Sequence, residues 1–123
     1  MSTVPAPHAP STLSDAEYRR ETDALLARIE ATTDRWLDED VVDIDTQRTG
    51  GLLELSFADG SKIVVNTQPP LHEVWLAARA GGYHYKWVDG RWLDTRDGRE
   101  FFDALSDCAS QQAGRRLVFA PPA

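Results

Sequence analysis

The sequence predicts an α+β fold, a two-layer sandwich in which two terminal helices pack on one face of a mostly antiparallel sheet of about six strands. Apolar residues recur at helical spacing over residues 15–37 and again after residue 97. Between these segments, short runs with a two-residue period are separated by tight turns. The 123 residues are the length of one domain, and 41% are hydrophobic, which is enough for one core.

The first helix is predicted over residues 15–37. Ser14 and Glu17 fit a capping box, in which each side chain bonds the backbone N–H of the other residue. The apolar stripe is only one face wide, so the helix must lie against a sheet. Residues 1–13 are rich in Pro, Ala, Ser and Thr and are predicted to be a disordered tail.

The strands follow from Val42 onward. Val42, Ile44 and Thr46 alternate with polar residues, which is typical of a strand with one buried face. Gly50-Gly51 turns the chain, and Asp59-Gly60 predicts a hairpin between residues 53–57 and 62–65. Three more short strands are expected, over residues 72–78, 83–88 and 91–94.

The second helix is predicted to be capped by Asp97, with Glu100 three residues later, and to end at Gly114. Phe101, Leu105 and Cys108 form its apolar stripe. The domain is therefore expected to span residues 14–114, followed by a C-terminal tail at residues 115–123.

The negative charge is concentrated in one stretch. The formal net charge is -7, and residues 30–45 alone hold seven acids and one base, Arg35. A nucleic-acid surface would be basic, and an anionic membrane would repel this stretch. The expected partner is cationic, either a metal ion or a basic protein surface.

Cellular location is predicted from two features. Cys108 is the only cysteine and cannot form an internal disulfide, and residues 1–10 lack the features of a signal peptide. No run approaches the roughly 18 apolar residues of a membrane span. We expect a cytoplasmic protein.

The acids of residues 30–45 stand where they destabilise the fold. Glu30, Asp34 and Asp38 stack on one side of the helix, and like charges at this spacing cost about 0.2–0.5 kcal/mol per pair. Carboxylates near the C-terminal end of a helix also oppose its dipole. Solubility or protection of a sheet edge is the alternative reason for such a cluster. If the cluster binds metal, its oxygen ligands suit hard cations, bound weakly and at several sites. We call the seven acids the acidic ridge: Glu30, Asp34, Asp38, Glu39, Asp40, Asp43 and Asp45.

Three segments resemble the bacterial frataxins of the CyaY type: TGGLLELSFADGSKIVVN, QPPLHEVWLAARAGGYHYKW and DGREFFDAL. The resemblance covers about residues 14–114. It implies the same sandwich, weak binding of ferrous and ferric iron on the acidic ridge, and a role in iron-sulfur cluster assembly. It also implies contact with a cysteine desulfurase and with the iron-sulfur scaffold protein. We expect a monomer and leave iron-induced oligomers open.

Carried over residue by residue, the resemblance places metal ligands on the seven ridge acids and the family's sheet tryptophan at Trp75. Strand periodicity turns Trp75 away from Val74 and Leu76, so we expect an exposed indole. Glu73 stands where the family more often carries Gln. The predicted partner-binding residues are Glu30, Asp34, Asp43, Asp45, Trp75, Asn66 and Gln68.

Three functional readings remain. The first is a non-enzymatic, iron-binding regulator that docks on the desulfurase. The second is iron storage or an enzyme, either a ferroxidase or an acid/base catalyst that uses paired carboxylates. An enzyme site would need a sheltered pocket. The third is an acidic adaptor whose metal binding is incidental. His72 and His84 are isolated and are expected to be structural, and Cys108 is expected to act as a small buried hydrophobe.

Overall fold

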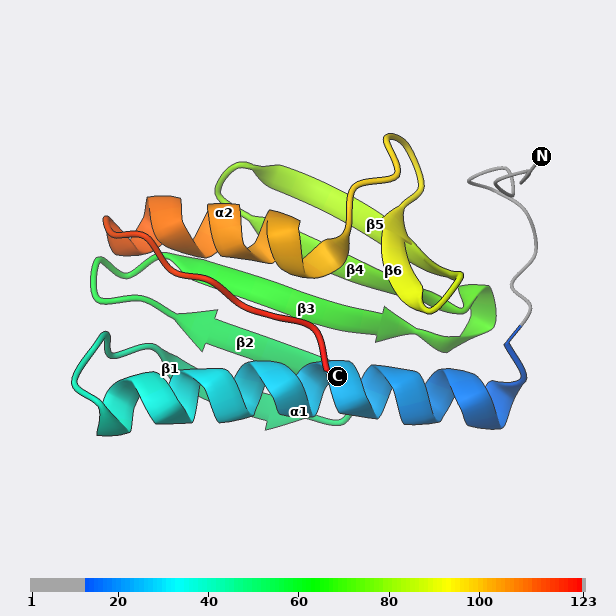
Figure 1. Cartoon of the computed structure of the whole chain (residues 1–123), viewed down its shortest axis with the longest axis horizontal. Coiled ribbons are helices and arrows are strands. Elements are labelled where there is room, and N and C mark those ends of the chain that lie inside the picture. The colour runs from blue at the N-terminus through cyan, green and yellow to red at the C-terminus, as the bar shows by residue number, and fades with distance from the viewer. Residues whose placement is uncertain (1–12, 123) are drawn as a thin grey trace.

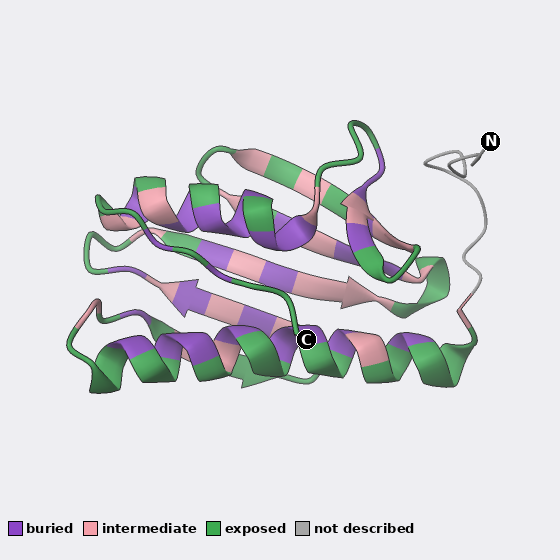
Figure 2. Cartoon of the chain, in the orientation of Figure 1, coloured by how far each residue is buried: buried purple, intermediate pink, exposed green. Residues whose placement is uncertain are grey.

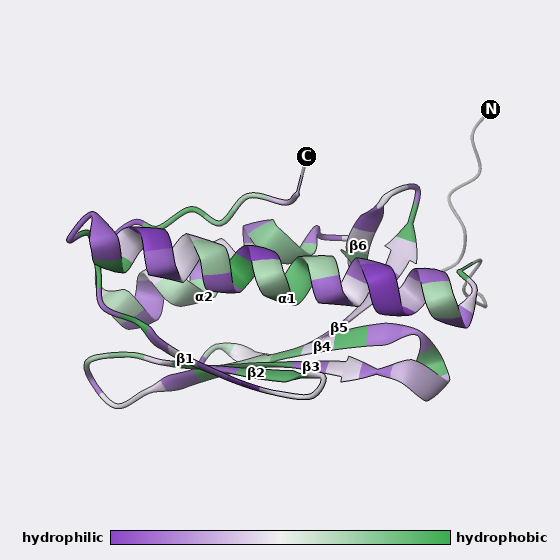
Figure 3. Ribbon diagram, turned by 90° about the horizontal axis from the view of Figure 1, so that it is seen from below, coloured by the Kyte–Doolittle hydropathy of each residue, from purple (hydrophilic) through white to green (hydrophobic). Residues whose placement is uncertain are grey.

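The computed structural model describes residues 13–122, and it has two layers (Figure 1). The order of elements is one helix, six strands with a single 3-10 turn, and a second helix. Figure 3 shows both helices on the same side of the sheet, and none of the described elements covers the opposite face, which we call the uncovered face. The predicted two-layer α+β sandwich is confirmed.

Helix α1 (Asp15–Asp38) begins at the predicted capping box. The Glu17 N–H donates to Ser14 Oγ at 3.1 Å, and the Ser14 N–H donates to Glu17 Oε1 at 3.0 Å. One face of the helix is buried against the sheet, as the one-face apolar pattern requires. Its buried residues are Tyr18, Thr22, Leu25, Leu26, Ile29, Thr32, Thr33 and Trp36.

The six strands pair antiparallel in chain order, so every connection is a hairpin or a short turn. Their bounds are β1 (Asp45–Thr49), β2 (Leu52–Ser56), β3 (Lys62–Gln68), β4 (Glu73–Ala78), β5 (Gly81–Val88) and β6 (Arg91–Asp94). The turn η1 (Pro69–Leu71) joins β3 to β4. Along the strands, buried residues alternate with more exposed ones (Figure 2). Leu53, Val65, Val74 and Tyr85 lie on the face that meets the helices.

Helix α2 (Phe101–Ala113) starts at a different cap from the predicted one. Glu100, not Asp97, is the N-cap, and its carboxylate accepts the N–H groups of Phe102 and Asp103. Asp97 instead accepts the Arg99 N–H at 2.9 Å in the preceding turn. The predicted end at Gly114 is confirmed, and its φ of 70° explains why a glycine stands there.

The segment after α2 packs on the domain, whereas the sequence predicts residues 115–123 to be a tail outside it. It runs between the two helices (Figure 1, red), with Leu117 and Phe119 buried and Val118 exposed. The hydroxyls of Ser106 and Ser110 bond its backbone. The segment also contacts α1, where Arg28 Nε donates to Ala120 O at 3.1 Å and the Trp36 ring packs on Phe119, so it bridges the two helices. Of the predicted N-terminal tail only Leu13 is described; residues 1–12 lie outside the described residues.

The four tryptophans are divided between core and surface. Trp36 and Trp92 are buried in the core, and Trp87 is half-buried against Trp92 with 5.2 Å between ring centroids. Trp75 points to the uncovered face. Within residues 13–122, neither helix combines the length and hydrophobicity needed to span a bilayer.

Candidate metal- and partner-binding surfaces

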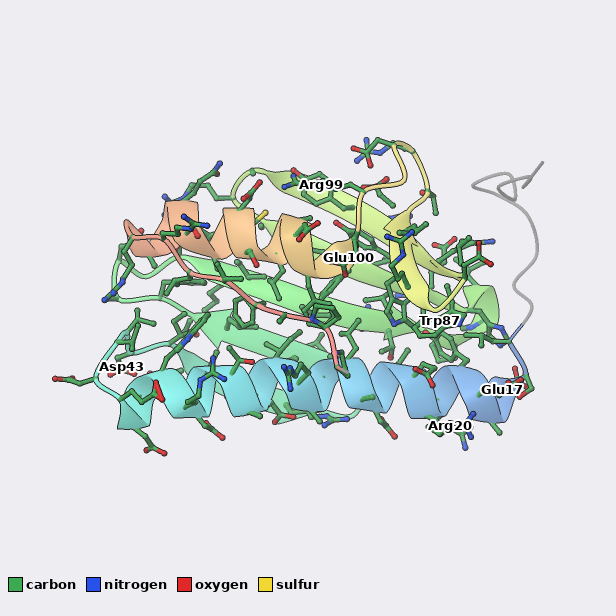
Figure 4. All side chains as sticks on the ribbon, in the orientation of Figure 1. Glu17, Arg20, Asp43, Trp87, Arg99 and Glu100 are labelled. Carbon is green, nitrogen blue, oxygen red and sulfur yellow. The ribbon has the colours of Figure 1, made fainter. Side chains whose placement is uncertain are left out.

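The acidic ridge extends from the last turns of α1 to the first residue of β1. Glu30, Asp34 and Asp38 belong to α1, Glu39 is its C-cap, and Asp45 begins β1. Asp40 and Asp43 lie in the connection between the two elements. Figure 4 shows Asp43 at the end of the molecule where α1 stops, with its side chain directed outward.

The strand predicted from Val42 begins only at Asp45, so Asp43 belongs to the connection. The alternation was still informative, because Ile44 is buried and Val42 packs partly against the core. The chain first has to turn away from the helix. Asp40 adopts a left-handed conformation with φ of 57°, and the Val41 N–H donates to Trp36 O at 2.8 Å.

Contacts with the rest of the protein fix this connection, with its apolar residues directed inward and its acids directed outward. Ile44 and Trp36 are in the core, and the Arg115 guanidinium donates to the carbonyl oxygen of Val41. With its backbone held by these contacts, the connection presents Asp40 and Asp43 to solvent. The ridge is therefore built on an anchored surface.

Only one ridge acid is paired in the described part of the chain. Arg48 on β1 donates to Glu30 at 3.0 Å and to Asp23 at 3.1 Å, which ties the edge strand to α1. The other six acids are exposed, and within residues 13–122 none of them has an ion-pair partner. Arg35, the basic residue in the last turn of α1, is itself exposed. The ridge thus keeps most of its negative charge.

The ridge does not form a metal cage. In the described residues, no group of three or more His, Cys, Asp or Glu side chains is arranged to hold a metal ion. Carboxylates spread over a convex surface can attract hard cations through one or two ligands each, while the ion keeps most of its water. The arrangement suits weak cation binding at several sites.

The second predicted surface is the uncovered face of the sheet. Register places Asn66, Trp75 and His84 side by side on β3, β4 and β5. The sequence predicts an exposed indole at Trp75, but the residue is half-buried. Its ring stacks on His84, with 4.2 Å between centroids and 6° between planes. Gln68 lies farther along β3, next to Glu73.

Glu73 is the functional candidate that the site prediction left out. The residue is only 8% exposed, and its carboxylate accepts the Trp75 indole N–H at 2.8 Å. Two cationic or protonatable groups of β5 face it, His84 Nδ1 at 3.6 Å and Lys86 Nζ at 4.0 Å. The pairing of Glu73 with Lys86 follows from the hairpin register, which was the signal available in the sequence.

A shallow hollow of about 260 Å³ lies beside the Trp75–His84 stack. Ala77 and Gly82 are paired across β4 and β5 and line it, and a Cβ on Gly82 would meet nothing within 4 Å. The remaining lining is mostly apolar, with Leu52 and Val64 on the β2–β3 side. This part of the sheet face can receive an apolar side chain.

The other sequence candidates have structural contacts. His72 Nε2 lies 2.7 Å from Asp15 Oδ1, and the His72 ring stacks on Tyr18. Cys108 is buried, and burial raises the pKa of its thiol. A buried thiol with a raised pKa is a poor nucleophile and metal ligand.

Comparison with known proteins shows the family to which this chain belongs. A sequence-family model described as frataxin-like domain matches residues 11–115. The chain belongs to the frataxin family. This match covers both surfaces described above.

Curated relatives of this frataxin-family chain are named iron-sulfur cluster assembly protein CyaY. The Paraburkholderia phymatum protein is 50% identical over 109 residues, which are 89% of this chain and 100% of the relative. A Burkholderia mallei protein is 52% identical over 108 residues, 88% of this chain and 99% of the relative.

Solved structures agree with the fold. A frataxin from Psychromonas ingrahamii superposes with a TM-score of 0.77 at 35% identity, covering 88% of this chain and 99% of that one. A trimeric frataxin from Saccharomyces cerevisiae, described as complexed with ferrous iron, has a TM-score of 0.63 at 21% identity, covering 87% of this chain and 92% of that one. At that identity the yeast structure supports the fold alone.

Proposed function

We propose that this chain is a non-catalytic regulator of iron-sulfur cluster assembly. It binds ferrous or ferric iron weakly on the acidic ridge and docks the same ridge on a basic surface of the cysteine desulfurase. The uncovered sheet face around Trp75, Asn66 and Gln68 contacts a second partner, the iron-sulfur scaffold protein.

The single observation that carries the proposal is the unpaired charge of the ridge. Most acids elsewhere in the molecule have a hydrogen-bond or ion-pair partner, for example Asp59 with Arg79 and Asp107 with Arg99. Six ridge acids have none in the described part of the chain. Clustered like charges repel one another, and a positively charged ligand or protein surface relieves the repulsion.

Carboxylate ligands are compatible with iron, and they also suit other hard cations such as Mg²⁺. Ferrous and ferric ions accept oxygen ligands, and a site without thiolate or imidazole lets them exchange with water. The absence of a three-ligand cluster in residues 13–122 supports weak binding, which suits an ion delivered or sensed at the surface. The names of the curated relatives support the pathway, iron-sulfur cluster assembly.

The test is binding of the full-length chain to the cysteine desulfurase by biolayer interferometry. Asp34→Lys with Asp43→Lys reverses two unpaired ridge charges, and Glu30 stays unchanged because Arg48 pairs with it. Glu21→Lys with Asp103→Lys is the matched control, with the same change in net charge away from the ridge. We expect the ridge variant to bind about tenfold or more weakly and the control to stay within about twofold. Equal losses in both variants would refute docking through the ridge.

Two other functions predict different results. A ferroxidase would consume oxygen with Fe²⁺ in many turnovers, and the ridge variant would lose this activity. A purely acidic adaptor would keep its salt-sensitive desulfurase binding while excess Mg²⁺ displaced all bound iron. The proposed regulator requires no oxygen-consuming turnover and some iron binding that Mg²⁺ does not displace.

A further inference from the structure

Glu73 is a buried carboxylate on a sheet face that otherwise meets solvent. It lies on β4, two residues before Trp75, so both side chains project from the same face. Its exposure is 8%, although neither of the helices in residues 13–122 covers this side of the sheet (Figure 3). Burying a charge is costly unless partners compensate for it.

The partners of Glu73 come from its own strand and the next one. Glu73 Oε1 accepts the Trp75 Nε1–H at 2.8 Å and lies 3.6 Å from His84 Nδ1, while Oε2 lies 4.0 Å from Lys86 Nζ. An indole N–H is a donor only, and this acceptor satisfies it. Glu73 is thus compensated by contacts to three side chains.

These contacts fix the orientation of the indole. Glu73 holds one edge of Trp75 through the N–H group, and His84 covers the ring at 4.2 Å in a nearly parallel stack. A ring held at its N–H and covered on one face has fewer accessible orientations than a free indole. The hollow floored by Ala77 and Gly82 lies directly alongside.

We propose that Glu73 is the positioning residue of the sheet-face docking surface. By holding Trp75 against His84, it keeps one wall of the hollow in place, so that a partner can insert an apolar side chain without first ordering the indole. Preorganisation of this kind lowers the entropy lost on binding. The inference rests on the proposed use of the sheet face for partner docking.

Two substitutions separate the acceptor from the volume of the side chain. Glu73→Gln keeps an oxygen acceptor for the indole N–H, and Glu73→Met keeps a similar volume without it. The first readout needs no partner: the Nε1–H resonance of Trp75 in ¹⁵N-labelled full-length protein, assigned with Trp75→Phe. We expect this resonance to stay near its native position in Glu73→Gln and to shift and broaden in Glu73→Met.

The second readout is affinity for the iron-sulfur scaffold protein, measured by calorimetry on variants whose circular dichroism spectra match the wild type. Because Trp75 is no longer ordered in Glu73→Met, this variant should bind about tenfold more weakly than the wild type. The affinity of Glu73→Gln should stay within about twofold of the wild-type value. Native affinity with a mobile indole in Glu73→Met would overturn the positioning role. A native Trp75 resonance in Glu73→Met would overturn it as well, because the indole would then not need Glu73.

The two readouts distinguish this inference from the function on which it rests. If wild type does not bind the scaffold protein, the proposed docking of the sheet face fails, and the Trp75 resonance still tests whether Glu73 orders the ring. If wild type binds and both variants lose affinity equally, charge and not the acceptor is decisive, and the inference is wrong.

Discussion

Carboxylates on the acidic ridge and on the uncovered sheet face differ in burial and in the number of their partners. On the sheet face, Glu73 is buried and surrounded by Trp75, His84 and Lys86. On the ridge, acids such as Asp34 and Asp43 are exposed and have no ion-pair partner in residues 13–122. Acids that stabilise the fold therefore have partners within it, whereas the unpaired ridge acids are not needed to stabilise the fold. Excess charge of this kind is available to a ligand.

The largest expected effect is the loss of an acid that the fold uses. Glu100→Ala removes the acceptor of two N–H groups at the start of α2, and we expect unfolding to become easier by about 1–2 kcal/mol. Urea unfolding followed by circular dichroism measures this change. An unchanged midpoint would mean that solvent caps α2 equally well and would weaken the contrast between the two kinds of acid.

Neutralising acids of the ridge should have the opposite effect and increase the stability of the protein. Asp34→Asn with Asp38→Asn removes repulsion at the C-terminal end of α1, so stability at low salt should rise by about 0.5–1 kcal/mol. The gain should shrink at high salt because ions screen the repulsion. A loss of stability in the same urea experiment would show that these acids hold the fold together.

Asp59 provides a pH-dependent version of the comparison. Hydrogen bonds from Ser61 and Arg79 lower the pKa of this carboxyl below its ordinary value. Its folded-state pKa is thus below its unfolded-state pKa, so the stabilisation is complete above about pH 4 and is lost as the pH falls further. We expect Asp59→Asn to be less stable than wild type at neutral pH and equally stable in strong acid. If the difference in stability between Asp59→Asn and the wild type is the same in strong acid, its cause is the turn geometry and not the charge of Asp59.

The smallest effect concerns a polar group without a partner inside the protein. The hydroxyl of Tyr85 is buried and, among the described residues, has no hydrogen-bond partner. Tyr85→Phe should change the free energy of unfolding by less than about 1 kcal/mol, in the stabilising direction. A clear loss of thermal stability would indicate that the hydroxyl has a bound water as its partner.

Much of the fold was predictable because its elements carry local signals. The capping box at Ser14, the turn at Asp59-Gly60 and the alternation around Val65 each specify one element within a few residues. The strand start was predicted too early, at Val42. The helix end at Asp38 forces a left-handed turn at Asp40 before pairing can begin.

What the sequence could not show comes from contacts across layers. The bond from Arg48 to Glu30 joins β1 to α1, and no spacing rule links residues 18 apart. The segment after α2 was missed for a different reason. Leu117 and Phe119 alternate with exposed Val118, which is a usable two-residue signal, but the stretch was too short to be distinguished from a tail.

The most direct test of the ridge as a cation-binding surface is an NMR titration of the full-length chain with Fe²⁺ in excess Mg²⁺. We expect paramagnetic broadening to be confined to amides of residues 30–45 and to persist at high Mg²⁺. Broadening spread evenly over acids such as Asp89 and Asp103, or abolished by Mg²⁺, would contradict the account.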